Sequence, residues 1–121
     1  MDRKILERRL VDFSISIIEL CQCCEFNAFT QHLSKQIVRS SSSSALNYGE
    51  AQSAESRADF AYKLSLVLKE LRETNINLFI IDKSGICRKQ EMINSLLNEC
   101  NQLVAIFQKS VNTIKINRKE K

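Results

Sequence analysis

The 121-residue sequence has no proline and only two glycines, Gly49 and Gly85. Because these residue types are the strongest breakers of regular structure, their scarcity favours long, uninterrupted helices. A long hydrophobic run is also missing, since four charged residues interrupt the apolar positions of the first thirty residues: Arg8, Arg9, Asp12 and Glu19. We therefore expect neither a signal peptide nor a membrane-spanning segment, which makes the cytoplasm the default location.

Residues that bind metals or carry out catalysis are also scarce. There is one histidine, His32, and the five cysteines (Cys21, Cys23, Cys24, Cys87 and Cys100) lack the two paired C-x-x-C motifs of a structural zinc site. Their odd number argues against a disulfide framework. The sequence contains no nucleophile elbow, no glycine-rich phosphate loop and no Glu-x-x-His motif. We therefore expect reduced thiols, no metal or other cofactor, and no enzymatic activity.

Apolar residues recur at spacings of three and four in the first, third and last parts of the chain. This spacing is typical of amphipathic helices that pack on neighbours. The three stripes are Leu6, Leu10, Phe13, Ile17, Leu20 and Cys24; then Phe60, Leu64, Val67, Leu71, Leu78 and Ile81; then Ile93, Leu96, Cys100, Leu103, Phe107, Val111 and Ile114.

The five consecutive serines, Ser40–Ser44, could mark a flexible linker or the middle of a helix. A linker of this kind would have no periodicity and would be rich in glycine. Instead, the helical stripe of Leu33 and Ile37 continues through Ser41, Ser44, Tyr48 and Ala51. We therefore predict a helix, in which small side chains let a neighbouring helix approach closely.

The predicted fold class is all-α, with residues 1–121 forming a single domain, because this length suits one domain. Four helices at about 3–24, 27–53, 55–82 and 88–113 would form an antiparallel, up-down-up-down bundle. Asn27 can cap the second helix, and Gly85 can end the third in the left-handed conformation. A frayed basic tail would follow at 114–121.

A hairpin of the second and third helices would bring polar residues to matching heights. The expected pairs are Arg39 with Glu70 and Glu73, and Asn47 and Glu50 with Lys63. These residues could form a solvated surface, where each ion pair contributes about 0–1 kcal/mol. Alternatively, they could form a partly buried network that fixes helix register or a subunit interface, where losing one partner costs about 3–5 kcal/mol. The sequence leaves both interpretations open.

The stretch from Gln36 to Phe79 resembles the 23S rRNA intervening-sequence protein family. The matching residues are Arg39, Ser40, Asn47, Glu50, Ala51, Ser56, Asp59, Phe60, Lys63, Lys69, Glu70, Glu73 and Thr74. Segments 5–13 and 98–115 resemble the first and last helices of that family. Two departures are the absence of a Leu-Pro pair between Leu20 and Glu25, and Asn77 at a position where an aromatic residue is common.

This resemblance implies four antiparallel helices assembled as a homopentamer with a central channel, and it implies no catalytic activity. Genes of the family lie within intervening sequences that interrupt some bacterial large-subunit ribosomal RNA genes. A related branch, the accessory variability protein of diversity-generating retroelements, is a pentameric barrel that binds a reverse transcriptase and nucleic acid. The expected partners are therefore further copies of the chain, together with RNA or DNA, or another protein.

Nine of the 18 lysines and arginines lie near the two ends of the chain, which the predicted topology places at one pole of the bundle. They are Arg3, Lys4, Arg8, Arg9, Lys109, Lys115, Arg118, Lys119 and Lys121. Such a pole suits the phosphate backbone of RNA or DNA. Three acidic residues, Asp2, Glu7 and Glu120, lie in the same stretches. The basic residues could also serve only to complement the dipole of the last helix and keep the protein soluble, and we favour contact with nucleic acid. The alternative function is a structural adaptor that binds a protein partner without contacting nucleic acid.

Overall fold

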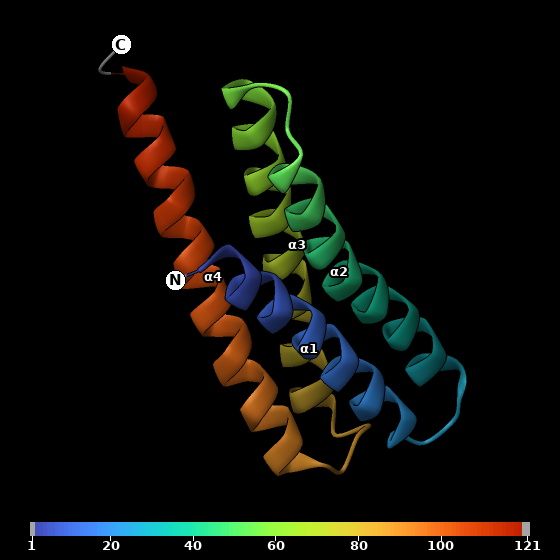
Figure 1. Ribbon diagram of the computed structural model, residues 1–121. Coiled ribbons are helices and arrows are strands. Elements are labelled where there is room, and N and C mark those ends of the chain that lie inside the picture. The colour runs from blue at the N-terminus through green and yellow to red at the C-terminus, as the bar shows by residue number, and fades with distance from the viewer. Residues whose placement is uncertain (1, 120–121) are drawn as a thin grey trace.

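The computed structural model describes residues 2–119, with side chains described through residue 117. Within this range it contains four α-helices: α1 (Arg3–Gln22), α2 (Ala28–Gln52), α3 (Arg57–Ser84) and α4 (Gln90–Lys119). Consecutive helices run antiparallel and pack on each other, and α4 returns to pack on α1 (Figure 1). The contact between α1 and α4 is the least extensive of the four. The predicted all-α, up-down-up-down bundle is therefore confirmed.

Local capping interactions explain where α2 and α3 begin and where α3 ends. The Asn27 side chain accepts hydrogen bonds from the backbone N–H groups of Phe29 and Thr30, and the Thr30 hydroxyl accepts one from the N–H of Asn27. Ser56 caps α3 by accepting from the N–H of Asp59. Gly85 ends α3 with a φ of 70°, the left-handed conformation predicted for it.

The last helix is longer than predicted. Its predicted end was 113, with a frayed tail from 114, but α4 is helical through Lys119. Residues 120 and 121 lie outside the described part of the chain. The extension has a physical reason: no glycine or proline follows Gly85, and Ile114 packs partly buried against the core, so the apolar stripe continues beyond 113.

The predicted apolar stripes form the core between the four helices. Of the stripe residues, Cys24, Leu33, Phe60 and Ile114 are only half-buried. The others are buried, and Phe107 packs edge-to-face on Tyr48 with ring centroids 5.4 Å apart. None of the described helices is long and apolar enough to cross a membrane.

The serine run lies within α2, as predicted. Ser40, Ser41 and Ser44 are fully buried. The Ser40 hydroxyl lies 2.7 Å from that of Thr74 on α3, and the Ser41 hydroxyl lies 3.4 Å from that of Ser14 on α1. Small hydroxyl side chains therefore face both neighbouring helices, and they exchange hydrogen bonds where larger apolar residues would hold the helices apart.

Candidate nucleic-acid interface

The basic residues at the start of α1 differ in how far they are available to a partner. Arg3 and Lys4 are exposed. Arg8 is also exposed, but its guanidinium Nε lies 3.1 Å from the Asp12 carboxylate one turn further along the helix. At such exposure this ion pair contributes little to stability, so a phosphate could replace Asp12 at low cost.

Arg9, predicted to bind nucleic acid, is partly buried and makes its contacts with α4. Its Nη2 and Nε donate to the two carboxylate oxygens of Glu99 on α4, at 2.6 and 3.1 Å, and Nη2 also donates to Gln102 at 3.2 Å. The hydrogen bond to Glu99 raises the pKa of the Arg9 guanidinium. This bidentate ion pair joins α1 to α4, so Arg9 positions a helix.

The contact between Arg9 and Glu99 also shows that α1 begins beside the middle of α4 (Figure 1). At about 1.5 Å per residue, α4 continues for roughly 25 Å beyond Gln102. Arg3 is therefore level with residues 105–108 and close in height to Lys109, whereas Lys115 stands about two turns further along. The start of α1 and the end of α4 point the same way, but they form an elongated strip where a compact pole was expected.

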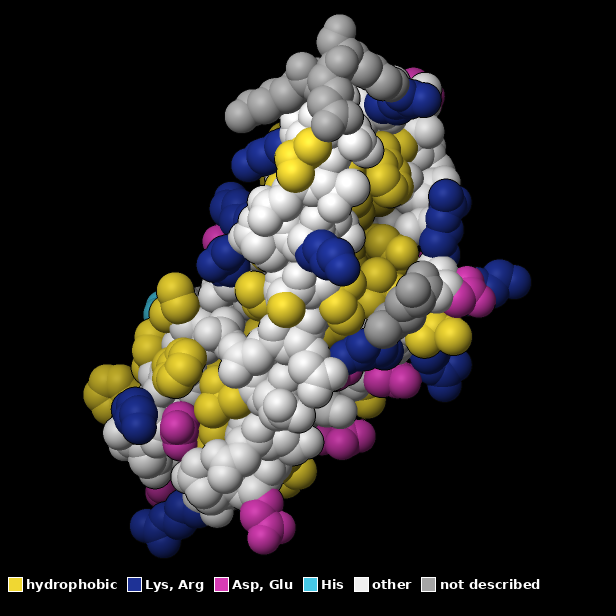
Figure 2. Space-filling view, turned by 90° about the vertical axis from the view of Figure 1, so that its left-hand side faces the viewer, with side chains coloured by type: hydrophobic (Ala, Val, Ile, Leu, Met, Phe, Trp, Pro, Cys, Tyr) yellow, Lys and Arg dark blue, Asp and Glu magenta, His cyan; other side chains and the backbone are white. Residues whose placement is uncertain are grey.

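Exposed cations line this strip. Lys109 and Lys115 are exposed on α4, while the side chains of Arg118 and Lys119 lie outside the described residues, as does Lys121. In Figure 2, Lys and Arg side chains outnumber Asp and Glu side chains on the upper half of the face. We call the exposed residues Arg3, Lys4, Lys109 and Lys115 the basic strip.

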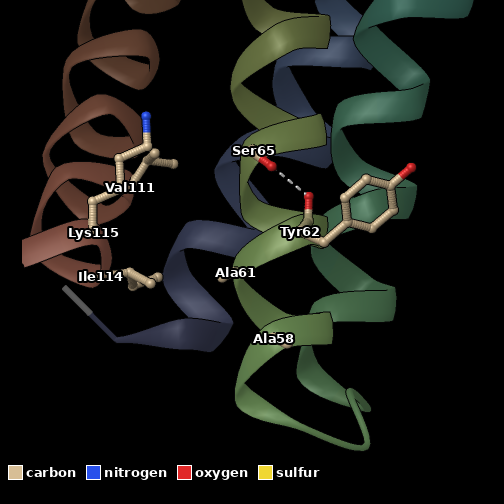
Figure 3. A pocket seen from close by; sticks show the side chains of 7 residues that line it. All are labelled: Ala58, Ala61, Tyr62, Ser65, Val111, Ile114 and Lys115. Atoms are coloured by element: carbon tan, nitrogen blue, oxygen red, sulfur yellow. Dashed lines mark hydrogen bonds between the residues drawn. The ribbon is translucent and has the colours of Figure 1, made fainter. Parts of the chain in front are cut away.

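An apolar groove accompanies the strip where the first turns of α3 face the last turns of α4 (Figure 3). Small residues on α3, Ala58 and Ala61, leave a hollow of about 230 Å³ opposite Val111 and Ile114. Lys115 stands at its edge, and the ring of Tyr62 points away from α4. The groove has no cluster of polar groups that would suggest chemistry.

The predicted polar cluster lies on the outside of the α2–α3 hairpin. Arg39 bonds to both Glu70 and Glu73, and Nζ of Lys63 lies 3.3 Å from the Glu50 carboxylate. Asn47 does not join Lys63 as expected; its amide donates to the Ser43 carbonyl within α2.

The members of this cluster differ in how far their side chains are exposed to solvent. The Arg39 side chain is 55% exposed and that of Glu70 only 12% exposed. Hydrogen bonding to Glu73 is the main cause that raises the pKa of Arg39, and Glu70 adds to it. Arg39, Glu50 and Glu73 therefore match the solvated interpretation, Glu70 matches the buried one, and Lys63, with its side chain 24% exposed, lies between them.

Sequence reasoning missed the polar contacts between α4 and its two neighbours. Besides Glu99 and Gln102, these include Gln108, which accepts from Arg72, and Asn101, which accepts from Asn75 at 3.0 Å. A signal was present, because these α4 residues form two pairs at helical spacing: Glu99 and Gln102 are three apart on the side of α1, and Asn101 and Gln108 are seven apart on the side of α3. What the sequence could not supply was the height of α1 relative to α4.

Comparison with known proteins agrees with the fold. The family model described as 23S rRNA-intervening sequence protein matches residues 5–109. A crystal structure from Bacteroides thetaiotaomicron VPI-5482, of a protein with unknown function from the S23 ribosomal protein family, is similar with a TM-score of 0.78 and 29% sequence identity. The match covers 93% of this chain and 99% of that one. None of the curated proteins compared matches the chain.

The family match spans the capping residues, the buried serines, the polar cluster on α2 and α3, and most of α4. The family resemblance seen in the sequence is thus confirmed over nearly the whole bundle. The chain belongs to the 23S rRNA-intervening sequence protein family.

Proposed function

We propose that this protein is a non-enzymatic bundle that binds the phosphate backbone of RNA or DNA through its basic strip. The observation that carries the proposal is the exposure of Arg3, Lys4, Lys109 and Lys115 along the strip, where they outnumber the neighbouring exposed carboxylates of Asp2 and Glu7. Lysine heads on flexible stems suit a regular array of phosphates, because they need no fixed base geometry.

Charge carries this interaction, so binding should be sensitive to salt. For duplex DNA, each phosphate contact adds about 0.9 to the slope of log K against log salt concentration. Changing both Lys109 and Lys115 to Gln should lower that slope by about 2 and weaken binding at every sequence alike. Fluorescence anisotropy with a labelled duplex and a labelled structured RNA measures both quantities.

A matched control is available at the opposite end of the bundle. Lys83 and Lys89 are exposed beside the turn between α3 and α4, so changing both to Gln removes the same charge away from the strip. This variant should keep most of the affinity of the unmodified protein. The proposal fails if the unmodified protein does not bind at low salt, or if the control variant weakens binding as much as the Lys109 and Lys115 variant.

We further propose that copies of the chain assemble into a homo-oligomer, a pentamer as the family resemblance implies. Exposed apolar residues lie on the outer faces of α1 and α3, which stand diagonally across the bundle. They are Val11, Ile15 and Ile18 on α1, and Ile76, Phe79 and Ile80 on α3. If the α1 face of one copy packs on the α3 face of the next, with a rotation of one fifth of a turn between copies, the repeated contact closes into a ring of five.

Light scattering on the native protein tests the assembly. Ile15→Glu places a charge in the α1 face and should reduce the mass to that of one chain. Leu46→Glu is the control, because Leu46 is exposed on α2 outside both faces. A single-chain mass for the unmodified protein would refute the assembly.

A structural adaptor that binds another protein is the alternative function, favoured by two aromatic side chains at the turn between α1 and α2. Phe26 is 84% exposed and Phe29 is 75% exposed. Exposed neighbouring aromatic residues of this kind are common in protein interfaces. Recovery of one protein partner in a pull-down after nuclease treatment, abolished by Phe26→Ser, would favour the adaptor over the nucleic-acid binder.

A further inference from the structure

Two cysteines from different turns come together at the end of the bundle opposite the basic strip. Cys24 lies in the turn between α1 and α2, and Cys87 lies in the turn between α3 and α4; both turns are at the lower end in Figure 1. Both sulfurs approach the backbone carbonyl oxygen of Leu20, Cys24 at 3.3 Å and Cys87 at 3.9 Å. Because they share one acceptor, the two thiols lie within a short distance of each other.

The surroundings of the three nearby thiols distinguish this pair from the C-x-x-C pair of Cys21 and Cys24. Burial raises the pKa of Cys24 to about 12, and a hydrogen bond with Cys87 is the next cause. Burial also raises the pKa of Cys21; Ser34 on α2 lowers it, and Cys87 raises it by a smaller amount. Among neighbouring groups, Cys87 therefore has the largest effect on Cys24, whereas Ser34 has the largest effect on Cys21.

A reagent in solution can reach Cys24 but not Cys87. An open hollow of about 680 Å³ separates the two turns and is lined by Cys23, Cys24, Glu25, Asn27, Gly85, Ile86 and Arg88. Cys24 is half-buried at this hollow, whereas Cys87 is buried beneath it. The arrangement places an accessible thiol in front of a sheltered one.

We propose that Cys24 and Cys87 are a modification site, at which a small disulfide such as oxidised glutathione converts the two thiols into an intramolecular disulfide. The positive charge of Arg88 at the hollow suits the carboxylates of glutathione. The bond ties the end of α1 to the start of α4, so it closes the part of the chain that contains α2 and α3.

The reaction is a two-step exchange. Cys24 loses its proton to water, and its sulfur attacks one sulfur of the glutathione disulfide; the S–S bond breaks and one glutathione leaves and takes up a proton. Cys87 then loses its proton and attacks the Cys24 sulfur, which releases the second glutathione. Two protein thiols are oxidised, and one glutathione disulfide is reduced to two thiols.

The experiment equilibrates the full chain in glutathione buffers of increasing oxidised fraction, blocks free thiols by alkylation, and maps the peptides after tryptic digestion. Trypsin separates peptide 10–35, which holds Cys21, Cys23 and Cys24, from peptide 84–88, which holds Cys87. The expected product links these two peptides. Absence of any protein disulfide in the most oxidising buffer, or a bond confined to peptide 10–35, would overturn the proposal.

Single variants identify the sulfur within peptide 10–35. Cys23→Ser and Cys21→Ser should keep the link to peptide 84–88, and Cys24→Ser should abolish it. A link that persists in Cys24→Ser would contradict the pairing. Because Cys24 is half-buried, its replacement should leave the helical circular dichroism unchanged, which separates loss of the bond from loss of the fold.

Two further readouts follow from the same chemistry. Since only the thiolate attacks, the initial exchange rate should rise about tenfold per pH unit between about pH 7 and pH 9, well below the pKa of Cys24. The oxidised protein should also unfold at a higher temperature than the reduced protein, because the bond restricts the unfolded chain. An oxidised form of unchanged or lower melting temperature would show that the two turns must move apart or distort to form the bond.

Discussion

At the scale of single residues, the interior of the bundle depends on size as much as on hydrophobicity. Ser40, Ser41 and Ser44 fill positions where the helical stripe of α2 faces its neighbours, and Thr74 faces them from α3. Among the described residues, no buried side-chain nitrogen or oxygen lacks a hydrogen-bond partner. Small hydroxyl groups therefore permit close helix packing without the cost of an unsatisfied polar atom.

Enlarging one of these residues should destabilise the bundle. Ser44→Leu places a larger side chain at a fully buried position, and overpacking costs about 1–3 kcal/mol. Ser42→Leu is the control, since Ser42 lies in the same run but is only half-buried. Urea unfolding measures both; equal stability of Ser44→Leu and the unmodified protein would mean that the helices can separate there freely.

The ion pair of Arg9 and Glu99 should contribute more than a surface pair. The two side chains are 23% and 32% exposed, which places the pair between the solvated and buried cases. A double-mutant cycle of Arg9→Gln and Glu99→Gln should give a coupling free energy of about 1–2 kcal/mol. A value near zero would mean that Arg9 is available to a phosphate after all.

At the scale of elements, the two glycines have opposite roles. Gly85 ends α3 with a positive φ, whereas Gly49 lies inside α2, where an added Cβ would meet only the Glu7 carboxylate oxygen at 3.8 Å. Glycine inside a helix lowers stability, because it loses more backbone entropy on folding than other residues do. Glycine at a left-handed helix end is favoured, because it has no Cβ to strain that conformation. The same substitution should therefore change stability in opposite directions at the two positions.

Gly85→Ala should destabilise the protein by about 1 kcal/mol, because the left-handed conformation is strained for any residue with a Cβ. Gly49→Ala should stabilise it by up to about 1 kcal/mol, because 3.8 Å is an ordinary van der Waals distance. Thermal unfolding of the two variants tests both signs. Destabilisation by Gly49→Ala would indicate that Glu7 cannot adjust to the added methyl group.

Features that depend on neighbouring residues in the sequence could be predicted, and features that depend on how distant helices pack could not. The helix at the serine run followed from the spacing of Leu33, Ile37 and Tyr48, and the end of α3 followed from Gly85. The prediction for the tail after 113 was wrong. Its charged residues suggested fraying, but the helix continues because Ile114 packs against the core. The pairing of Arg9 with Glu99 could not be predicted, because it depends on how far α4 extends past α1.

At the scale of the whole molecule, the four contacts between helices differ in extent. The α2–α3 contact is the most extensive, and that between α1 and α4 the least. Arg9 on α1 makes hydrogen bonds across this small contact to Glu99 and Gln102 on α4. In the proposed ring, the α3 face of a neighbouring copy would pack on α1 and add to this small contact.

The small contact between α1 and α4 leads to a prediction about the order in which the helices fold and unfold. Joining α1 to α4 connects the most distant parts of the sequence, so its closure costs more chain entropy than the α2–α3 hairpin and should come later in folding. By the same reasoning, α1 should separate first while the other three helices stay paired. Amide hydrogen exchange should find α1 less protected than α3, and equal protection would mean that the four helices open only together.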